Sequence, residues 1–366
     1  MNKKERFQAV CEKRVPDCMP VFPRVKAQTI WGQGLKISEV TGPDWFDSDK
    51  ITEAVLASIK NVGYDVAIGS YIDIAFGIPA LGGKISIPTK FGMAVGTPDQ
   101  EKPVQTKADW PKIKKKLATC DVTTADPRMK GALEVIKNVS REVGDEMALV
   151  PMYAVGTSAA MVLLRPTKNL IEDMVEDPEW VEEMCHDATD FAIDWIRAQY
   201  EAGANSSAFI SEAIGTALIS PEMSERFNLE NIARVVETVR KEFNQGTWIH
   251  IHGDMKTPKA YKYLIKLAMQ AGIQGFHFDE KHPTEWIMQN VVYRLGKPAC
   301  IITHGDNILN GPVEKIRREV KEQISQIGDG LGVMMAPSCQ ILNTTSNENF
   351  KAWVDASHEY GKYPLQ

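Results

Sequence analysis

Hydrophobic positions along the chain fall into short apolar runs that alternate with longer amphipathic segments. The runs are rich in residues that favour strands, and their length suits buried strands of a parallel sheet. Eight runs of this kind lie at 19–25, 65–69, 147–153, 206–211, 247–253, 275–279, 299–305 and 331–337. The pattern therefore predicts eight short strands.

The segments between these runs have the period of helices. In the segment 311–328, apolar residues recur at three- and four-residue steps and form one stripe, made of Val313, Ile316, Val320, Ile324 and Ile327. Ser220 and Thr257 are typical N-cap residues in front of two further helical segments. In "EAGA" (201–204) and "QAGI" (270–273), glycine follows a predicted helix, which is the expected C-cap position.

Eight strand-then-helix units predict an α/β fold, a (β/α)8 TIM barrel with an N-terminal extension. A doubly wound sheet is the competing fold, but no glycine-rich phosphate fingerprint follows the first strand. The segment 77–88, "GIPALGGKISIP", is interpreted as a small β excursion outside the barrel. No low-complexity linker divides the chain, so we expect residues 1–366 to form a single domain.

Composition and charge exclude several classes of protein. Hydrophobic content is 43%, charged content is 25% and the formal net charge is −6, so nucleic acid is not expected as a partner. The apolar stretch 147–164 is interrupted by Pro151, and no membrane span is expected. The N-terminus lacks the apolar core of a secretory signal, and the six cysteines contain no CxxC pair. These features favour a cytoplasmic protein with reduced thiols.

Active sites of such barrels lie at the carboxyl ends of the strands. Polar residues that suit metal binding or catalysis cluster at these predicted ends, namely Glu212, His250, His252, Asp279, Glu280, His304, Asp306 and Cys339. Three of the seven histidines of the chain belong to this set. The rule therefore predicts one polar pocket.

The stretch "WIHIHGD" (248–254) carries the most specific signal. Side chains alternate along a strand, so His250 and His252 leave the same face, and such a pair suits a tetrahedral metal. The competing interpretation is that both histidines are packed, hydrogen-bonded core residues. Taken singly, Cys339 is more often a small buried hydrophobe than a ligand, and Glu212 is equally suited to cap a helix. The remaining histidines are interpreted as structural or surface residues, namely His186, His277, His282 and His358.

Several longer motifs bear a resemblance to a known family. They are "ERFQAV" (5–10), "RVPDCMPVFP" (14–23), "ALGGKISIP" (80–88), 177–227, "WIHIHGD" and 311–361. With them the chain resembles the uroporphyrinogen decarboxylase superfamily, and within it the zinc- and corrinoid-dependent methyltransferases, over nearly its full length. The resemblance implies the same barrel fold.

Two departures bear on function. True uroporphyrinogen decarboxylases carry an arginine-rich segment that grips the substrate carboxylates, whereas 23–34, "PRVKAQTIWGQG", holds one arginine. Decarboxylation of a tetrapyrrole is therefore not expected. The methyltransferases typically have His-x-Cys after the fifth strand and one further Cys after the eighth, all binding zinc. Their pattern maps onto His250 and Cys339, with His252 in place of the middle cysteine.

The resemblance implies zinc bound by His250, His252 and Cys339, with Glu212 or water as a candidate fourth ligand. Exchanging a thiolate for a neutral imidazole makes the zinc site one unit more positive and a stronger Lewis acid. This favours demethylation of a methylated small molecule, such as a methyl ether, with transfer to cob(I)alamin (cobalamin) on a separate corrinoid protein. Asp279, His304 or Glu212 would deliver a proton or orient the substrate.

Two alternatives stay open. The first is the coenzyme M type of reaction, methyl transfer from a methylcorrinoid to a thiol. The second is a barrel without zinc that acts as a lyase or as a binding protein. The sequence does not choose the methyl donor.

Overall fold

Short parallel strands form the centre of the computed structural model, which describes residues 1–68, 74–90, 95–212 and 215–365. Six of them form one sheet in the order β3-β4-β5-β6-β7-β8, and β1 pairs with β2 in parallel. The strands are β1 (Val66–Ala67), β2 (Ala148–Leu149), β3 (Met152–Ala154), β4 (Ala208–Glu212), β5 (Thr247–Ile251), β6 (Gly275–Phe278), β7 (Ala299–Thr303) and β8 (Val333–Pro337). Each lies within, or one residue beyond, a predicted run; Gly69, the last residue of the run 65–69, lies outside the described residues.

Backbone hydrogen bonds close the strands into a ring. Residues 20–22 lie between β8 and β1, because the amide of Phe22 donates to the carbonyl of Met335 and the amides of Asp65 and Val66 donate to that of Val21. On the other side of β1, β2 continues into β3 across Pro151, whose carbonyl accepts from Phe209 in β4. The predicted (β/α)8 barrel is therefore confirmed. The run 19–25, predicted as its first strand, is not a regular strand; it takes that place in the ring through these bonds and an isolated parallel bridge between Val21 and Met335.

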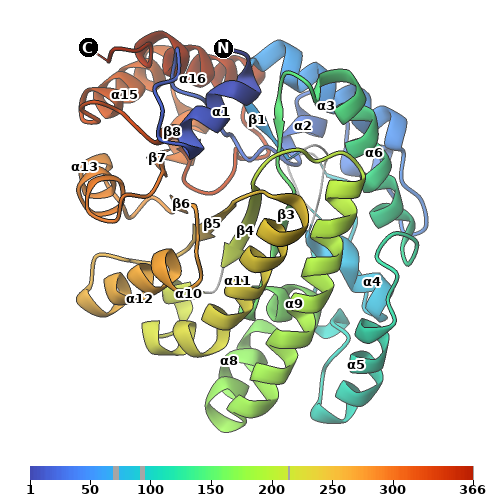
Figure 1. Cartoon of the computed structure of the whole chain (residues 1–366). Coiled ribbons are helices and arrows are strands. Elements are labelled where there is room, and N and C mark those ends of the chain that lie inside the picture. The colour runs from blue at the N-terminus through green and yellow to red at the C-terminus, as the bar shows by residue number, and fades with distance from the viewer. Residues whose placement is uncertain (69–73, 91–94, 213–214, 366) are drawn as a thin grey trace.

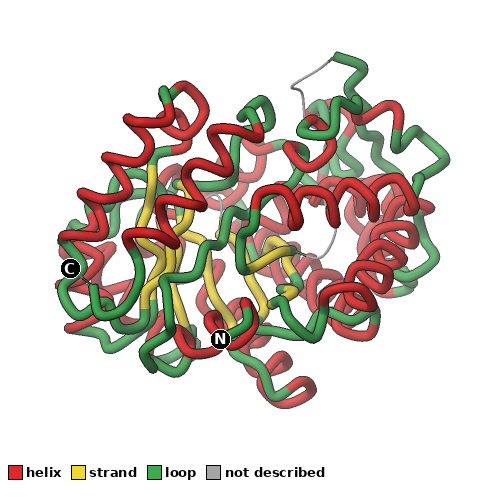
Figure 2. The backbone as a smooth tube through the Cα atoms, turned by 90° about the horizontal axis from the view of Figure 1, so that it is seen from above, coloured by secondary structure: helices red, strands yellow, loops and turns green. Residues whose placement is uncertain are grey.

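Helices surround the ring, as Figures 1 and 2 show. The long helices are α1 (Lys3–Cys11), α3 (Ser48–Val62), α5 (Trp110–Ala118), α6 (Pro127–Val143), α8 (Thr167–Glu176), α9 (Pro178–Glu201), α11 (Pro221–Phe243), α12 (Pro258–Met269), α15 (Val313–Ser325) and α16 (Asn347–Tyr360). Shorter helices are α2 (Gln28–Trp31), α4 (Ile78–Leu81), α7 (Thr157–Leu163), α10 (Gly215–Leu218), α13 (Thr284–Ile287) and α14 (Gly305–Asn310), and a π-helical segment (Met288–Tyr293) follows α13.

The sequence signals for helices correspond to observed ends and faces. The Ser220 side chain accepts from the Met223 amide at the start of α11, and Thr257 caps α12 in the same way. In α15, Ile316, Val320 and Ile324 are buried, as the apolar stripe predicts. These helices form locally because a cap satisfies the first amides and one face is apolar.

The prediction of a β excursion at 77–88 is wrong for most of the segment. Residues 78–81 form the short helix α4, and Gly82 follows with a φ of +97°. Only Ser86 pairs, through an isolated antiparallel bridge to Gly96. Pro79 in the first turn favours the helix, and glycine tolerates the left-handed conformation that ends it.

The N-terminal extension closes the amino end of the barrel. Helix α1 contacts β1, β2 and β8, and its Phe7 ring lies 6.0 Å from the Trp248 ring, which belongs to β5. Both side chains are buried. The carboxyl end of the barrel is thus the end left for a site.

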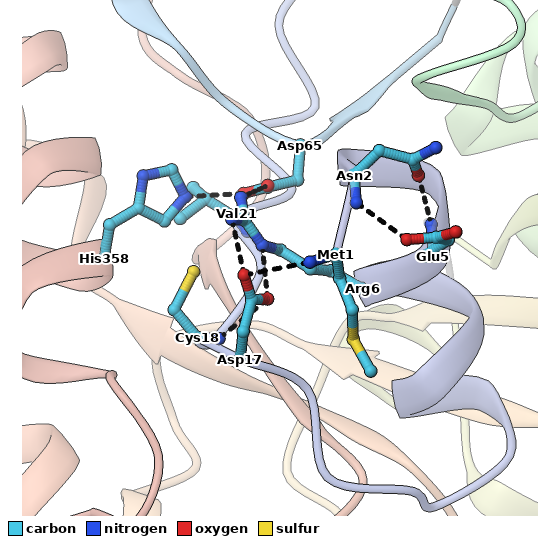
Figure 3. A network of polar contacts seen from close by, with 9 residues as sticks. All are labelled: Met1, Asn2, Glu5, Arg6, Asp17, Cys18, Val21, Asp65 and His358. Atoms are coloured by element: carbon cyan, nitrogen blue, oxygen red, sulfur yellow. Dashed lines mark hydrogen bonds and ion pairs between the residues drawn. The ribbon is translucent and has the colours of Figure 1, made fainter.

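A network of charges holds this closed end together (Figure 3). The Asp65 carboxylate is fully buried and accepts from Arg6, from the Val21 amide at 2.9 Å and from His358 at 2.6 Å. The Arg6 guanidinium also pairs with Asp17 at 2.7 Å. These contacts join α1, the segment 17–21, the residue directly before β1 and α16. We name the five residues Arg6, Asp17, Val21, Asp65 and His358 the closure network.

Within the described ranges, no helix combines the length and the apolar character that crossing a bilayer requires.

Candidate metal centre

Strand β5 sends one column of side chains into the barrel. Trp248, His250 and His252 alternate with outward-facing Ile249 and Ile251, as the period of a strand requires. Trp248 lies at the closed end, His250 is fully buried in the middle, and His252 is partly exposed at the carboxyl end. The column therefore runs from the closed end of the barrel to its open end.

His250, His252 and Cys339 come together at this open end. Nε2 of His250 lies 2.8 Å from Nε2 of His252, and one candidate ligand atom from each of the three residues lies within 4.8 Å of the others. Cys339 follows β8 and is partly exposed. We name these three residues the metal cluster. Along the described part of the chain, the other group of this kind is His186, Asp187 and Asp190 on α9, of which His186 and Asp190 are exposed.

The surroundings of the Cys339 thiol favour its ionised form. Burial acts to raise its pKa, but the Arg24 guanidinium, a hydrogen bond with His252 and the Lys26 charge outweigh burial and lower it to about 7. The Arg24 side chain donates to the Cys339 carbonyl at 2.7 Å, and the same nitrogen lies 3.8 Å from the sulfur. A thiolate, the form that binds metals, is therefore accessible at neutral pH.

Arg24 is a site residue that the sequence reasoning missed. It is buried, its φ is +48°, and its guanidinium carbon lies 5.0 Å above the Phe209 ring. Its Nε atom has no hydrogen-bond partner, and burial lowers its pKa. Arg24 lies near the carboxyl end of the predicted run 19–25, so the rule of strand ends applied to this run would have drawn attention to it.

His277 is the second missed residue. It lies on β6 in register with His250, and the two Nδ1 atoms are 2.6 Å apart. Both side chains are fully buried. Burial, and next the Arg24 charge, place the pKa of each ring well below the ordinary value, so both imidazoles are neutral. The signal was present in the sequence, because His277 has the inward position of "GFHFD".

Asp279 lies beside the cluster and holds a loop. Its carboxylate accepts from the Gly253 amide at 2.8 Å and lies 3.3 Å from Nδ1 of His282. Burial acts to raise the pKa of Asp279, but hydrogen bonds from His282, Gly253 and Lys281 lower it overall. Asp279 therefore fixes the chain directly after His252.

Glu212 does not face the metal cluster. In β4 its neighbour Ser211 is in register with His250, so Glu212 points to the opposite face. There it accepts from Asn228 of α11 and from the Tyr263 hydroxyl of α12, each at 3.0 Å. Burial raises its pKa to about 8, although these hydrogen bonds act against the rise.

His304 lies at the same end of the barrel as the cluster but in solvent. It precedes α14 as its N-cap residue and is exposed. Glu280 and Asp306, also named at predicted strand ends, are exposed. Of the six residues predicted as metal ligands or catalytic residues, the structure brings three together. It places Asp279 next to them, Glu212 behind β4 and His304 at the surface.

The donor set of the metal cluster fits zinc. Zinc takes imidazole nitrogen and thiolate sulfur in a tetrahedral arrangement, and three protein ligands leave a fourth position for substrate or water. His250 is neutral and the Cys339 pKa is lowered, so both offer lone pairs at neutral pH. The cluster is partly exposed only at His252 and Cys339, which face the open end of the barrel.

Comparison with known proteins identifies the family. The profile of the family Uroporphyrinogen decarboxylase (URO-D) matches residues 2–360. The chain belongs to this family. Among its relatives, the methylcobamide:CoM methyltransferase MtaA of Methanosarcina barkeri is 22% identical over 357 residues, and MtbA of Methanosarcina acetivorans is 23% identical over 361. Each alignment covers 98% of both proteins.

A solved structure shares the fold of this family member. The methyltransferase from Methanosarcina mazei superposes with a TM-score of 0.76 at 22% identity, covering 98% of this chain and 99% of the other. The predicted barrel and family are confirmed. The predicted enzyme class, methyltransferase, is confirmed by the named relatives.

Proposed function

We propose that this chain moves a methyl group from a methylated small molecule, most of all a methyl ether, to cob(I)alamin carried by a separate corrinoid protein. The observation that carries the proposal is the metal cluster: two imidazoles and one ionisable thiol meet at the open end of a barrel. Zinc is the metal that fits them. We take residues 1–366 as one domain of a cytoplasmic protein.

When bound, zinc would supply a Lewis acid that holds the substrate heteroatom. The chain's own part is to set the charge around that atom. Two neutral imidazoles and one thiolate compensate one unit of the metal's charge, and the Arg24 guanidinium adds a positive charge 3.8 Å from the thiolate sulfur. Such a site stabilises negative charge that develops on a departing oxygen.

The transfer breaks the bond between oxygen and the methyl carbon. The electron pair of that bond stays on oxygen, the methyl group passes to cobalt, and the oxygen then takes up a proton. His304 is our proposed proton donor, because it is exposed at the end of the barrel that carries the cluster. Asp279 acts through His252 by holding the Gly253 amide.

The corrinoid must approach the open end of the barrel. His252 and Cys339 are partly exposed there, whereas the opposite end is closed by α1. The names of MtaA and MtbA include a methylcobamide. We therefore propose transient docking of a corrinoid protein over the carboxyl ends of the strands.

Similarity to MtaA and MtbA over nearly the full chain favours a second candidate, methyl transfer from a methylcorrinoid to a thiol. A positive cluster also suits a thiolate acceptor. The two candidates differ in direction and in the atom that zinc would hold, oxygen or sulfur.

One experiment tests both candidates. Purified wild type is incubated with cob(I)alamin and a panel of methoxy compounds, and separately with methylcobalamin and thiols, and the cobalamin spectrum is recorded. We expect methylation of cobalt in the first reaction. Methyl transfer only in the second reaction would select the thiol reaction. If neither reaction transfers a methyl group and the protein binds no zinc, the barrel has another function.

The variant His252→Cys sharpens this test, because it restores the family's His-x-Cys pattern and adds a thiolate to the site. We expect it to keep zinc, to lose at least about 10-fold in ether cleavage and to gain in thiol methylation. His186→Cys is the control, since it adds a thiol at an exposed position of α9. Equal ether cleavage by His252→Cys and wild type would contradict the charge argument.

A further inference from the structure

A third histidine lies directly behind the metal cluster. His277 and His250 occupy adjacent strands in register, and their ring centroids are 4.6 Å apart at an interplanar angle of 67°. Each ring turns Nδ1 toward the other, at 2.6 Å. His250 turns its other nitrogen, Nε2, toward His252 at 2.8 Å. The three rings therefore form a chain that ends at the open side of the barrel.

Only one hydrogen fits between the two Nδ1 atoms. Two lone pairs at this distance repel, and two hydrogens clash, so one ring donates and the other accepts. If His277 donates, neutral His250 carries its own hydrogen on Nε2 and has no lone pair for a metal. If His277 accepts, His250 carries its hydrogen on Nδ1, and its Nε2 lone pair points toward the cluster.

We propose that His277 is a positioning residue, which accepts the hydrogen bond of His250 and thereby holds the His250 tautomer that binds metal through Nε2. The inference rests on the proposed metal site. A ligating histidine usually donates its second nitrogen to a carboxylate, a backbone carbonyl or water, and such partners fix the ring and raise its basicity. Here the neutral His277 imidazole faces that nitrogen, and a hydrogen bond with the His277 backbone also acts on the His250 ring.

The His277 ring lies in an aromatic and cationic environment. It meets Phe209 in an edge contact, with ring centroids 5.7 Å apart, and the Arg24 guanidinium carbon lies over the same Phe209 ring, 5.0 Å from its centroid. A carboxylate at position 277 would pair with the buried Arg24 charge instead. An imidazole avoids this because it is neutral.

The test measures zinc affinity and tautomer separately. Wild type, His277→Leu, His277→Asn and Phe276→Leu are titrated with zinc against a chromophoric chelator. His277→Leu removes the acceptor, and we expect zinc to bind about 10- to 100-fold more weakly. His277→Asn keeps an oxygen near the place of Nδ1 and should recover most of the affinity. Phe276→Leu removes a buried ring next to His277 on β6, on the opposite face of the strand, and should bind like wild type.

The second readout is the ¹⁵N NMR spectrum of the histidine rings in metal-free protein, with His250 assigned by the loss of its signals in His250→Gln. We expect a protonated Nδ1 and an unprotonated Nε2 on His250 in wild type, and a mixture in His277→Leu. If His277→Leu fails to fold, the wild-type spectrum still shows which nitrogen of His250 carries the hydrogen. The zinc affinity of His277→Asn still shows whether an acceptor oxygen can replace Nδ1 of His277.

Failure of the inference and failure of the proposed function give different results. A wild-type protein that binds no zinc overturns the metal site, whatever the tautomer. A wild-type protein that binds zinc, with equal affinity in folded His277→Leu or with the hydrogen of His250 on Nε2, overturns the role of His277 alone.

Discussion

The two ends of the barrel both bury charged or ionisable groups, but they differ in how these groups are paired. In the closure network the buried carboxylate is Asp65, and the donors around it are Arg6, the Val21 amide and His358. Beside the metal cluster the buried cation is Arg24; no carboxylate among the described residues pairs with it, and its Nε has no hydrogen-bond partner. Within the described part of the chain, one end therefore pairs its buried charge and the other keeps an unpaired cation.

The difference separates stability from function. A buried charge with full partners fixes the parts of the chain that donate to it, but it has nothing left to offer a ligand. The metal cluster offers two imidazoles and a thiol, whose lone pairs a metal can use in place of the contacts that these groups make with one another. We infer that the closed end maintains the barrel and that the open end performs the reaction.

The largest effect is expected at the closed end. Asp65→Ala removes the acceptor from three donors and should lower the free energy of unfolding by about 3–5 kcal/mol, because the Arg6 charge loses its buried partner. Asp17→Ala is the matched control. Asp17 contacts the same Arg6, but its side chain is 43% exposed, so about 1 kcal/mol or less is expected.

Chemical denaturation measures both variants. Zinc bound per folded chain should be unchanged in Asp65→Ala, because the network lies at the opposite end of the strands. Equal destabilisation by the two variants would show that burial of Asp65 does not determine how much this carboxylate contributes to the free energy of unfolding.

The next effect depends on pH and concerns Glu212, which the sequence predicted as catalytic. Its pKa rises from 4.5 to about 8 in the folded chain, so between these values the folded state holds a proton that the unfolded state has lost. The free energy of unfolding should therefore fall as pH rises through this window, by at most about 1.4 kcal/mol per pH unit.

Glu212→Gln should remove this slope, because an amide stays neutral and still accepts from Asn228. Zinc binding should not change. Glu237→Gln, an exposed carboxylate on α11, is the control and should keep the wild-type slope. The assignment would be contradicted if the free energy of unfolding of wild type does not fall with rising pH in this window. It would also be contradicted if that of Glu212→Gln falls as steeply as that of wild type.

The smallest effect concerns the cation at the open end. In metal-free protein, alkylation of Cys339 should reach half its maximal rate near pH 7, where its pKa lies. Arg24→Gln should move this midpoint toward the ordinary value of 9, and Lys26→Gln should move it less, because Lys26 contributes the smaller charge effect. The other five cysteines have raised pKa values because of burial, so mass spectrometry of the labelled peptides isolates Cys339. A midpoint that Arg24→Gln leaves in place would remove Arg24 from the account.

Sequence reasoning predicted the barrel well, because buried parallel strands are continuous apolar runs and their helices carry caps and stripes. It failed at 77–88, where a proline in the first turn and glycines after it build a short helix. The His250 and His252 pair followed from alternation alone. The rule of strand ends placed Cys339 at the same end of the barrel, and the family resemblance then joined it to the pair as a ligand, although 86 positions separate it from Gly253.

The errors in the site have a common cause. Glu212 was chosen for its place at a strand end, whereas alternation from inward Ser211 sends it toward the helices. His277 was set aside although the same alternation places it beside His250. The left-handed backbone of Arg24, which brings its side chain to Cys339, leaves no mark in the sequence, since glycine or asparagine is the usual residue there.

The central claim is that the open end holds zinc through the metal cluster, and metal content tests it most directly. Wild type, Cys339→Ala and Cys300→Ala are purified without chelator, supplied with Zn²⁺ and analysed for bound metal. Cys300 is a buried thiol on β7 and serves as the matched control. We predict about one zinc per chain in wild type and Cys300→Ala and almost none in Cys339→Ala. Wild type without zinc, or Cys339→Ala with as much zinc as wild type, would contradict the account.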